Sequence, residues 1–272
     1  MKKGLLASSI IASLDFLRFA FGSLLTKEFL KLALPLMLLW EIAGRVGWVS
    51  RNLIPTFSDV VLAFLNLLLH KHLLIYVADS LLTFFLGIFL AVILAVPLGI
   101  VVGWNVYLRK HILPFFQLLA PIPPLAWAPL TIIFFGIGLP MKVFLIFLGA
   151  FFPIFLNTYQ AVKDTDPRYL ASARVFGASE WTLLVHVYFW QALGAILMSV
   201  KTGIALGLVM LTAAEMYGGR SGIGFLLMQA KEFFQIPVMV VCMLLLGGIG
   251  WFLIELLKYL ELKLSVWKEV RG

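Results

Sequence analysis

The side chains in this sequence that could do chemistry are charged groups inside long apolar runs. Glu41, Lys201, Glu215 and Glu255 each interrupt such a run. A charge in a water-poor environment is costly, so such residues often mark ion or solute pathways. The alternative is that the glutamates lie near a membrane interface, and that Lys201 extends its ammonium group toward water. Both interpretations remain open at this stage.

Lys201 and Glu215 would lie on one face of the same helix. A helix rises about 1.5 Å per residue, which separates them by roughly 21 Å. They therefore cannot pair with each other, and each needs another partner. We name both as candidate residues of a solute path.

Catalytic and metal-binding patterns are weak. Residues 219–222 read Gly-Arg-Ser-Gly, the Gly-x-Ser-Gly pattern of intramembrane serine proteases, but that chemistry needs a histidine base on a later helix. All the histidines precede Ser221, and His70 and His72 would point to different faces of a helix, with no carboxylate to complete a metal set. No segment has the Gly-x-x-x-x-Gly-Lys-Ser/Thr spacing of a nucleotide-binding P-loop. The sequence predicts no catalytic residue, no metal site and no cofactor bound by this chain.

Composition indicates a membrane protein. Of 272 residues, 62% are hydrophobic and 12% charged, whereas about 25% are charged in an ordinary soluble domain. Apolar runs of roughly 20 residues recur, each long enough to cross a hydrocarbon core of about 30 Å. Because these runs are continuous rather than alternating, they predict helices and not a barrel. We expect an all-α integral membrane fold with about six transmembrane helices, at 29–46, 77–103, 113–137, 141–162, 193–216 and 237–258.

The basic residues predict the topology. The net charge is +8, but the Lys and Arg residues are scattered between apolar runs rather than gathered in one stripe. This distribution suits a lipid membrane and not nucleic acid. Most of them fall in the N-terminal segment, in the loops 104–112 and 163–192, and in the tail, which places these segments and both termini in the cytoplasm. We divide the chain into an N-terminal cytoplasmic or interfacial segment with an amphipathic helix (1–28), a transmembrane domain (29–262) and a cytoplasmic tail (263–272).

Two external segments are predicted to be too short to span. Ser58 is a candidate N-cap for an apolar helix that continues through Leu69. The segment 218–237 combines glycines with a short helix, which we expect to lie on or dip into the outer surface. The only cysteine, Cys242, lies inside an apolar run, which excludes an intrachain disulfide.

The third predicted span contains a cluster of prolines. Pro121, Pro123, Pro124 and Pro129 remove amide donors and oppose a continuous helix. Broken backbone at membrane depth is tolerated only where it is packed in protein or lines a wet cavity. Residues 122–127, with Trp127, are therefore either a packed kink or part of the wall of a solute path.

The loop 163–190 contains residues that predict where two short helices start and where the first of them ends. Asp166 and Pro167 form a helix start, with an N-cap followed by proline at the first helical position. Gly177 supplies a left-handed stop, and Ser179 caps a second helix that starts near Glu180. A short, sharply terminated helix on the cytoplasmic face suits a docking element for a separate protein, although a surface helix without a partner is equally compatible with the pattern.

Residues 169–179 of this loop resemble the Glu-Ala-Ala-x-x-x-Gly loop of type I binding-protein-dependent ABC importer permeases. The proline string 121–130, the segments 135–138 and 147–153, and residues 213–215 and 221–224 are similar to the branch that imports nitrate, sulfonates, taurine and bicarbonate. The resemblance covers residues 53–267. It implies a type I permease fold in a bacterial inner membrane and import of a small solute, such as one of these anions. The implied ATPase-coupling residues are Asp166, Pro167, Arg168, Leu170, Ala171, Ala173, Arg174, Phe176, Gly177, Ala178 and Ser179.

The same resemblance implies partners that the sequence does not contain. They are two cytoplasmic ATPase subunits, which hold the ATP and Mg²⁺, an extracytoplasmic solute-binding protein, and a second permease copy. Two positions depart from the family pattern, because Ala171 stands where the motif has an acid and Trp190 where it has a proline. A heterodimer with a different permease therefore stays open beside a homodimer. The alternative function is an ion-gradient-driven secondary transporter, which would place ionisable groups at mid-membrane and usually show an internal repeat.

Overall fold

The computed structural model describes residues 27–46, 54–70 and 73–264. Every regular element in this part of the chain is helical, in agreement with the predicted fold class. The amphipathic helix predicted within 1–28 and most of the tail lie outside the described residues. The elements are α2 (Lys27–Val46), α3 (Phe57–His70), α4 (Leu73–Trp104), α5 (Val106–Leu119), η1 (Pro124–Trp127), α6 (Ala128–Phe135), α7 (Leu139–Lys163), α8 (Pro167–Val175), α9 (Glu180–Leu183), η2 (Leu184–Tyr188), α10 (Phe189–Gly218), α11 (Ile223–Glu232) and α12 (Ile236–Leu264).

The chain forms two compact units. One is the continuous segment Leu74–Leu226, which holds α4 to α10 and the first turn of α11. The other combines α2 and α3 with the rest of α11 and α12. Nearly all the site residues predicted from the sequence fall in the first unit.

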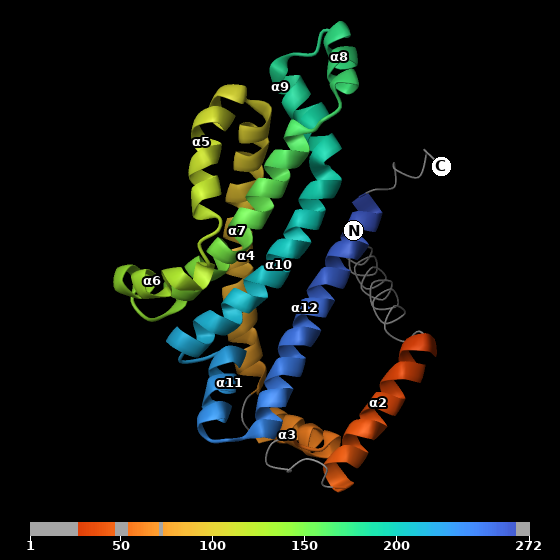
Figure 1. The fold of residues 1–272 in the computed structure, drawn as a ribbon, viewed down its shortest axis with the longest axis vertical. Coiled ribbons are helices and arrows are strands. Elements are labelled where there is room, and N and C mark those ends of the chain that lie inside the picture. The colour runs from red at the N-terminus through yellow and green to blue at the C-terminus, as the bar shows by residue number, and fades with distance from the viewer. Residues whose placement is uncertain (1–26, 47–53, 71–72, 265–272) are drawn as a thin grey trace, which may run out of the picture. The chain divides into compact units, whose positions relative to one another are not determined.

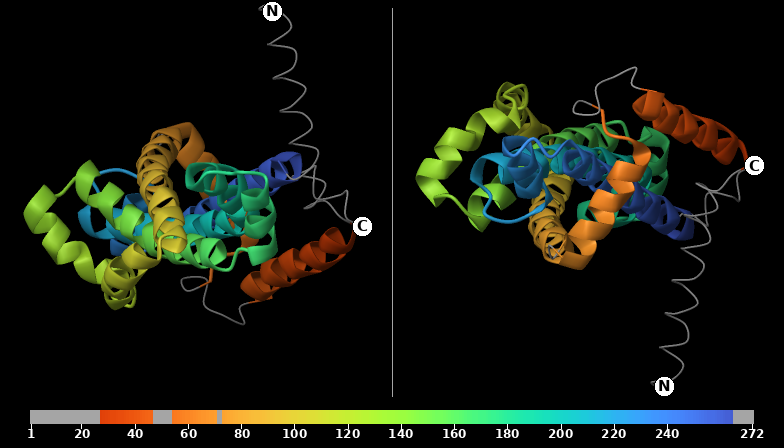
Figure 2. Two further views of the ribbon diagram at one scale, coloured as in Figure 1. Left: turned by 90° about the horizontal axis from the view of Figure 1, so that it is seen from above. Right: turned by 90° about the horizontal axis from the view of Figure 1, so that it is seen from below.

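The first unit is built around α7 and α10, which run side by side (Figures 1 and 2). Glycines allow the helices to approach closely. A Cβ on Gly203 of α10 would lie 2.7 Å from Cδ1 of Ile154, and one on Gly99 of α4 would lie 2.9 Å from the backbone oxygen of Phe155. Small residues at such contacts are the usual means of packing helices in lipid, where no hydrophobic force drives them together.

Within the described residues, four helices are long and apolar enough to cross a membrane: Leu73–Trp104, Leu139–Lys163, Glu180–Gly218 and Ile236–Leu262. They match the predicted spans 77–103, 141–162, 193–216 and 237–258. A fifth results if α5 and the η1–α6 segment count as one broken span.

The first predicted span, 29–46, is not among these helices. It forms α2, a helix of 20 residues, but Lys31, Glu41 and Arg45 lie within it. These charges keep α2 below the apolar content of a clear spanning helix, even though Glu41 and Arg45 pair at 2.7 Å. The sixth span therefore remains a prediction.

The break in the third span is confirmed. Helix α5 ends at Leu119, a turn follows, and the η1–α6 segment leaves at 84° to α5 (Figure 2). Gly136, with φ of 69°, then ends α6 in a conformation that a side chain disfavours. The prolines act as predicted, because they remove the donors that would continue α5 into α6.

In the second unit, the start of α3 differs from the prediction. The backbone N–H of Asp59 donates to Thr56 Oγ1 at 3.2 Å, and the N–H of Thr56 donates to Asp59 Oδ2 at 3.1 Å. This reciprocal pair caps the helix at Thr56, so Ser58 is not the N-cap. Ser58 instead donates its hydroxyl to Glu41 of α2 at 2.6 Å, which ties the two helices together.

Candidate functional site

The loop 163–190 forms a helical hairpin that begins with a double cap on α8. The carboxylate of Asp166 accepts the backbone N–H of Arg168 at 2.9 Å. It also forms a salt bridge with the Arg168 guanidinium at 2.8 Å. These two interactions hold the pKa of Asp166 below its usual value, the Arg168 side chain contributing most. The predicted helix start is confirmed, with Pro167 as the first helical residue.

The end of α8 is a left-handed turn at Gly177, as predicted. The N–H of Gly177 donates to the carbonyl of Arg174 at 2.9 Å, and that of Ala178 donates to the carbonyl of Ala173 at 3.1 Å. With φ of 80° at Gly177, these bonds form a Schellman motif. A Cβ on Gly177 would meet no atom within 4 Å, so backbone conformation alone favours glycine there.

The second arm of the hairpin is anchored to the first and to α4. Ser179 caps α9 through a bond from the N–H of Thr182 at 3.2 Å, confirming the predicted cap. Glu180 pairs with Arg174 of α8 at 3.1 Å and accepts the indole N–H of Trp104 at 3.4 Å. A single π-helical stretch, Leu184–Tyr188, then joins α9 to α10. The hairpin is therefore held to the end of α4 as well as to α7 and α10.

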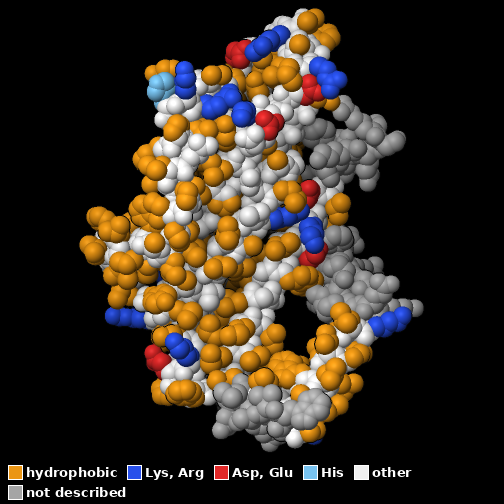
Figure 3. All heavy atoms as spheres, in the orientation of Figure 1, with side chains coloured by type: hydrophobic (Ala, Val, Ile, Leu, Met, Phe, Trp, Pro, Cys, Tyr) orange, Lys and Arg blue, Asp and Glu red, His pale blue; other side chains and the backbone are white. Residues whose placement is uncertain are grey.

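Apolar side chains project from the hairpin. Val175 is 85% exposed, Phe176 90% and Trp181 72%. Charged side chains gather over this end of the unit, around α8, α9 and the start of α5, whereas the flank formed by α5 and α6 is largely hydrophobic (Figure 3). Exposed aromatic groups beside charges are typical of protein docking surfaces.

Glu215 lies in a buried polar cluster near the end of α10. Its side chain is fully buried, and its carboxylate accepts the Ser80 hydroxyl at 2.8 Å and the N–H of Gly224 at 2.8 Å. The Ser80 oxygen in turn accepts the N–H of Ile223 at 2.8 Å. One carboxylate thus joins α4, α10 and the start of α11.

The loop between α10 and α11 closes over this carboxylate. Gly222 has φ of 114°, and a Cβ there would overlap the Glu215 carboxylate. The Ser221 hydroxyl donates to Asp79 Oδ2, and Lys142 Nζ donates to the Ser221 carbonyl at 3.4 Å. Ser221 is therefore part of a structural network, and no histidine is among these partners.

The residues predicted for a solute path are not all brought together. Trp127 packs on a cluster that includes Met141 and Ala214, so it lies beside the end of α10 that carries Glu215. Among the described residues, its indole N–H has no hydrogen-bond acceptor. Lys201 lies elsewhere on α10, with Nζ 3.7 Å from the sulfur of Met198. Of the prolines in the break, Pro121 and Pro123 are exposed and Pro124 is partly buried.

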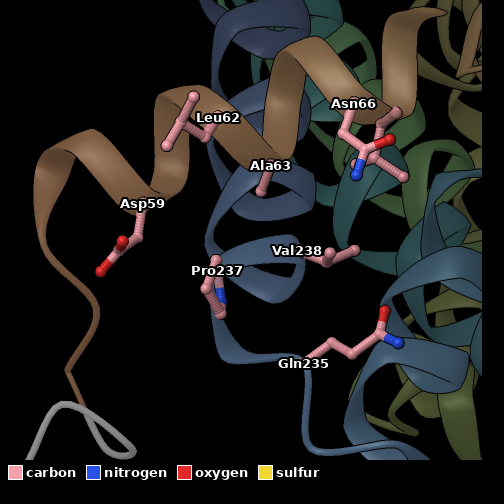
Figure 4. Close-up of a pocket in the computed structure, with 8 residues that line it drawn as sticks. Asp59, Leu62, Ala63, Asn66, Gln235, Pro237 and Val238 are labelled. Carbon is pink, nitrogen blue, oxygen red and sulfur yellow. The ribbon is translucent and has the colours of Figure 1, made fainter. Parts of the chain in front are cut away.

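A shallow pocket in the other unit lies between α3 and the start of α12 (Figure 4). Asp59, Asn66 and Gln235 place polar groups around it, and Leu62 and Val238 add apolar walls. Asp59 is already engaged in the cap of α3. The pocket shows no convergence of charge that would identify a ligand.

Sequence reasoning missed Asp79, Ser80 and Lys142. Asp79 and Lys142 lie inside predicted spans, so the rule that selected Glu215 should have selected them as well. Ser80 carries no charge and adjoins Asp79, and only the fold brings it to Glu215.

Residues 87–265 match the family described as binding-protein-dependent transport system inner membrane component. The chain belongs to this family, the permease subunits of ABC importers. It is 38% identical over 215 residues to the aliphatic sulfonates transport permease SsuC of Escherichia coli, covering 78% of this chain and 80% of that protein. It is 33% identical over 257 residues to the ABC transporter permease MJ0413 of Methanocaldococcus jannaschii, covering 90% and 94%. It is also similar to the E. coli taurine permease TauC, at 34% identity over 75% of this chain and 73% of that protein.

Proposed function

We propose that this chain conducts a small anion through a bacterial inner membrane, and that two cytoplasmic ATPases drive it by docking on the hairpin 163–190. The observation that carries the proposal is the exposed apolar tip of α8, where Val175 and Phe176 project from a helix fixed at both ends. A rigid helix transmits displacement, and an exposed aromatic side chain provides a binding anchor. ATP and Mg²⁺ are held by the ATPase subunits.

The remaining partners follow from the family. A solute-binding protein delivers the solute on the outer side, and a second permease subunit completes the path. Relatives named for sulfonates, taurine and nitrate support a small oxyanion as the solute. Around the path we place the broken third span, with Pro121, Pro123, Pro124 and Trp127, together with Lys201 and Glu215.

Ala171 is exposed on α8, so the acid that the family motif has at this position would face the ATPase. Arg168 and Arg174 lie three residues to either side of Ala171 and would flank such an acid on the helix. The missing charge supports an ATPase surface adapted to this permease, or a second permease subunit that carries the acid.

Truncation of Phe176 tests the docking proposal. Phe176→Ala removes a side chain that is 90% exposed, so it should leave the folding stability within about 0.5 kcal/mol of the original. If Phe176 is an anchor, ATPase binding should weaken by about 2 kcal/mol, roughly 30-fold. Co-purification of the ATPase with the detergent-solubilised permease at graded concentrations measures the change.

Val106→Ala is the matched control, because Val106 is 68% exposed at the start of α5, in a loop assigned to the same side of the membrane. It should leave ATPase binding unchanged. If both variants bind the ATPase as tightly as the original chain does, the hairpin tip is not part of the docking surface.

A further inference from the structure

Helices α7 and α10 carry two matching stripes, whose residues are small or polar apart from Met198. Each stripe follows the i, i+3, i+4, i+7 spacing that places side chains on one helical face. Together they line a groove with a cavity volume of about 480 Å³, within the roughly 300–1,000 Å³ range of small-molecule sites. The lining residues are Asn157, Gln160 and Ala161 on α7, Asp164 at its C-cap, and Ala195, Met198, Ser199 and Thr202 on α10.

The surroundings make this groove unusual. Both helices are long apolar spans, yet Asn157, Gln160 and Thr202 are exposed on the surface of the single chain. Any polar atom of these side chains that faces hydrocarbon beyond the hydrogen bonds it makes within the chain costs several kcal/mol. The groove must therefore face water or polar protein groups.

The hydrogen bonds within the groove determine which donors and acceptors remain for a solute. The hydroxyls of Ser199 and Thr202 donate to carbonyls of their own helix, at 2.7 Å and 3.3 Å, which leaves their oxygen lone pairs as acceptors. Gln160 donates to the Asp164 carboxylate at 2.8 Å. Such a wall solvates water and polar solutes well but does not hold an anion tightly.

The position of the groove is equally informative. Asp164 is the C-cap of α7 and lies two residues before Asp166, the N-cap of α8. The groove therefore lies between the same two helices that carry the hairpin, at the end nearest to it. Lys201 places a cation beside the groove through its contact with Met198. A displacement of the hairpin would shift both walls.

We propose that this groove forms one side of the inner vestibule of the solute path. The vestibule is filled with water, and a small polar solute leaves along it after passing the membrane. The proposal rests on the proposed transport function. Its acceptor-rich surface and the Asp164 carboxylate suit release, because conduction requires weak binding at the exit.

Cysteine labelling tests the vestibule, and this chain is well suited to it because Cys242 is its only cysteine. In a Cys242→Ala background, Asn157→Cys and Thr202→Cys place one thiol on each wall. The probe is a membrane-impermeant methanethiosulfonate reagent bearing a sulfonate, applied to inside-out vesicles that contain the whole transporter. Phe115→Cys is the control, because Phe115 is apolar and 59% exposed. Its neighbour Phe116 contacts Phe155 with ring centroids 4.5 Å apart, so Phe115 lies at a depth close to Asn157.

We expect thiols at positions 157 and 202 to react at least tenfold faster than the thiol at 115. Rates equal to the control would overturn the vestibule, and so would spontaneous disulfide-linked permease pairs at 157 or 202, because they would make this face a dry interface between copies. Co-purification of the ATPase with the same variants tests the proposed docking on the hairpin 163–190 separately. Fast labelling in a permease that does not co-purify with the ATPase would support the vestibule and count against docking on the hairpin. Slow labelling in a permease that does co-purify with the ATPase would support docking and overturn the vestibule.

Discussion

At the scale of single residues, the roles of Gly177 and Glu215 can be stated from their surroundings. Gly177 has open space around its Cα and a positive φ, so only its backbone conformation matters. Glu215 is the opposite case, because its buried carboxylate accepts hydrogen bonds from the Ser80 hydroxyl and the Gly224 N–H. The two residues therefore respond differently to substitution.

Gly177→Val should uncouple transport from ATP hydrolysis and leave membrane insertion intact. A left-handed conformation costs a residue with a side chain about 1–2 kcal/mol, and the cost is greater for a β-branched one, so the hairpin turn would change shape. Gly177→Asn is the matched control, because asparagine tolerates this conformation and the space is open. Solute uptake and ATP hydrolysis are measured together in proteoliposomes. Normal uptake by the valine variant would show that the turn is not needed.

Glu215→Ala should destabilise the permease strongly. It leaves the Ser80 hydroxyl and the Gly224 N–H without their acceptor, at about 1–3 kcal/mol for each buried unsatisfied group. The two groups together cost about 2–6 kcal/mol. With roughly 2–4 °C lost per kcal/mol in a chain of this size, the melting temperature in detergent should fall by about 4–24 °C. Glu215→Gln keeps one acceptor oxygen, so its melting temperature should fall less. An unchanged melting temperature for the alanine variant would mean that the network is not stabilising.

At the scale of elements, local signals predicted what local interactions decide. The sequence alone placed the Asp166 cap, the Gly177 stop and the Ser179 cap, because each depends on neighbouring residues. It also placed the break in the third span, where four prolines exclude a straight helix. The start of α3 was misplaced because Thr56 and Asp59 form a better reciprocal cap than Ser58, which Glu41 of α2 engages instead.

The remaining features depend on distant partners and could not be predicted. Ser80 meets Glu215 only because α4 and α10 pack together, and the groove exists only because two stripes on α7 and α10 face the same side. The residues of the two stripes stand at helical spacing in the sequence, although none of them was predicted as part of a site. Which neighbour each stripe meets depends on the packing of helices, which sequence spacing does not determine.

The start of α8 should be stable throughout the physiological pH range. The pKa of Asp166 is lowered in the folded chain, chiefly by Arg168, so the stabilisation is fully present above the ordinary value of about 3.8 and is lost as the pH falls through the folded value. Hydrogen exchange of the Arg168–Leu170 amides, corrected for intrinsic rates, should show constant protection from pH 5 to 8. The Asp166→Asn variant should keep the cap and its protection. In the Asp166→Ala variant the same amides should exchange severalfold faster. Loss of protection near pH 6 would contradict this account of the cap.

Replacement of Trp127 distinguishes the two readings of the broken span. Trp127→Phe keeps the aromatic ring against Met141 and removes an N–H that has no acceptor among the described residues. If the break lines the path, solute uptake should change while melting temperature stays within a few degrees. Unchanged uptake with unchanged ATPase stimulation would assign the break a packing role.

At the scale of the whole molecule, the open question in the topology is α2. In the part of the chain that the structure describes, four clear spans and one broken span would place the segments before α4 and after α12 on opposite sides of the membrane. A spanning α2 would instead place both termini in the cytoplasm, as the distribution of basic residues predicts. Alkaline phosphatase, active only outside the cytoplasm, can be fused before residue 27 and after residue 272. We expect both fusions to be inactive. An active N-terminal fusion would show that α2 does not cross the membrane.

The central claim is that this permease imports its solute using ATP hydrolysed by partner subunits. The most direct measurement is solute uptake into proteoliposomes that contain this chain with the proposed second permease subunit and the proposed ATPases, with the proposed solute-binding protein outside and ATP inside. The account predicts uptake that requires both ATP and the binding protein and does not respond to an imposed ion gradient. Uptake driven by an ion gradient in the absence of ATP would contradict it and establish a secondary transporter.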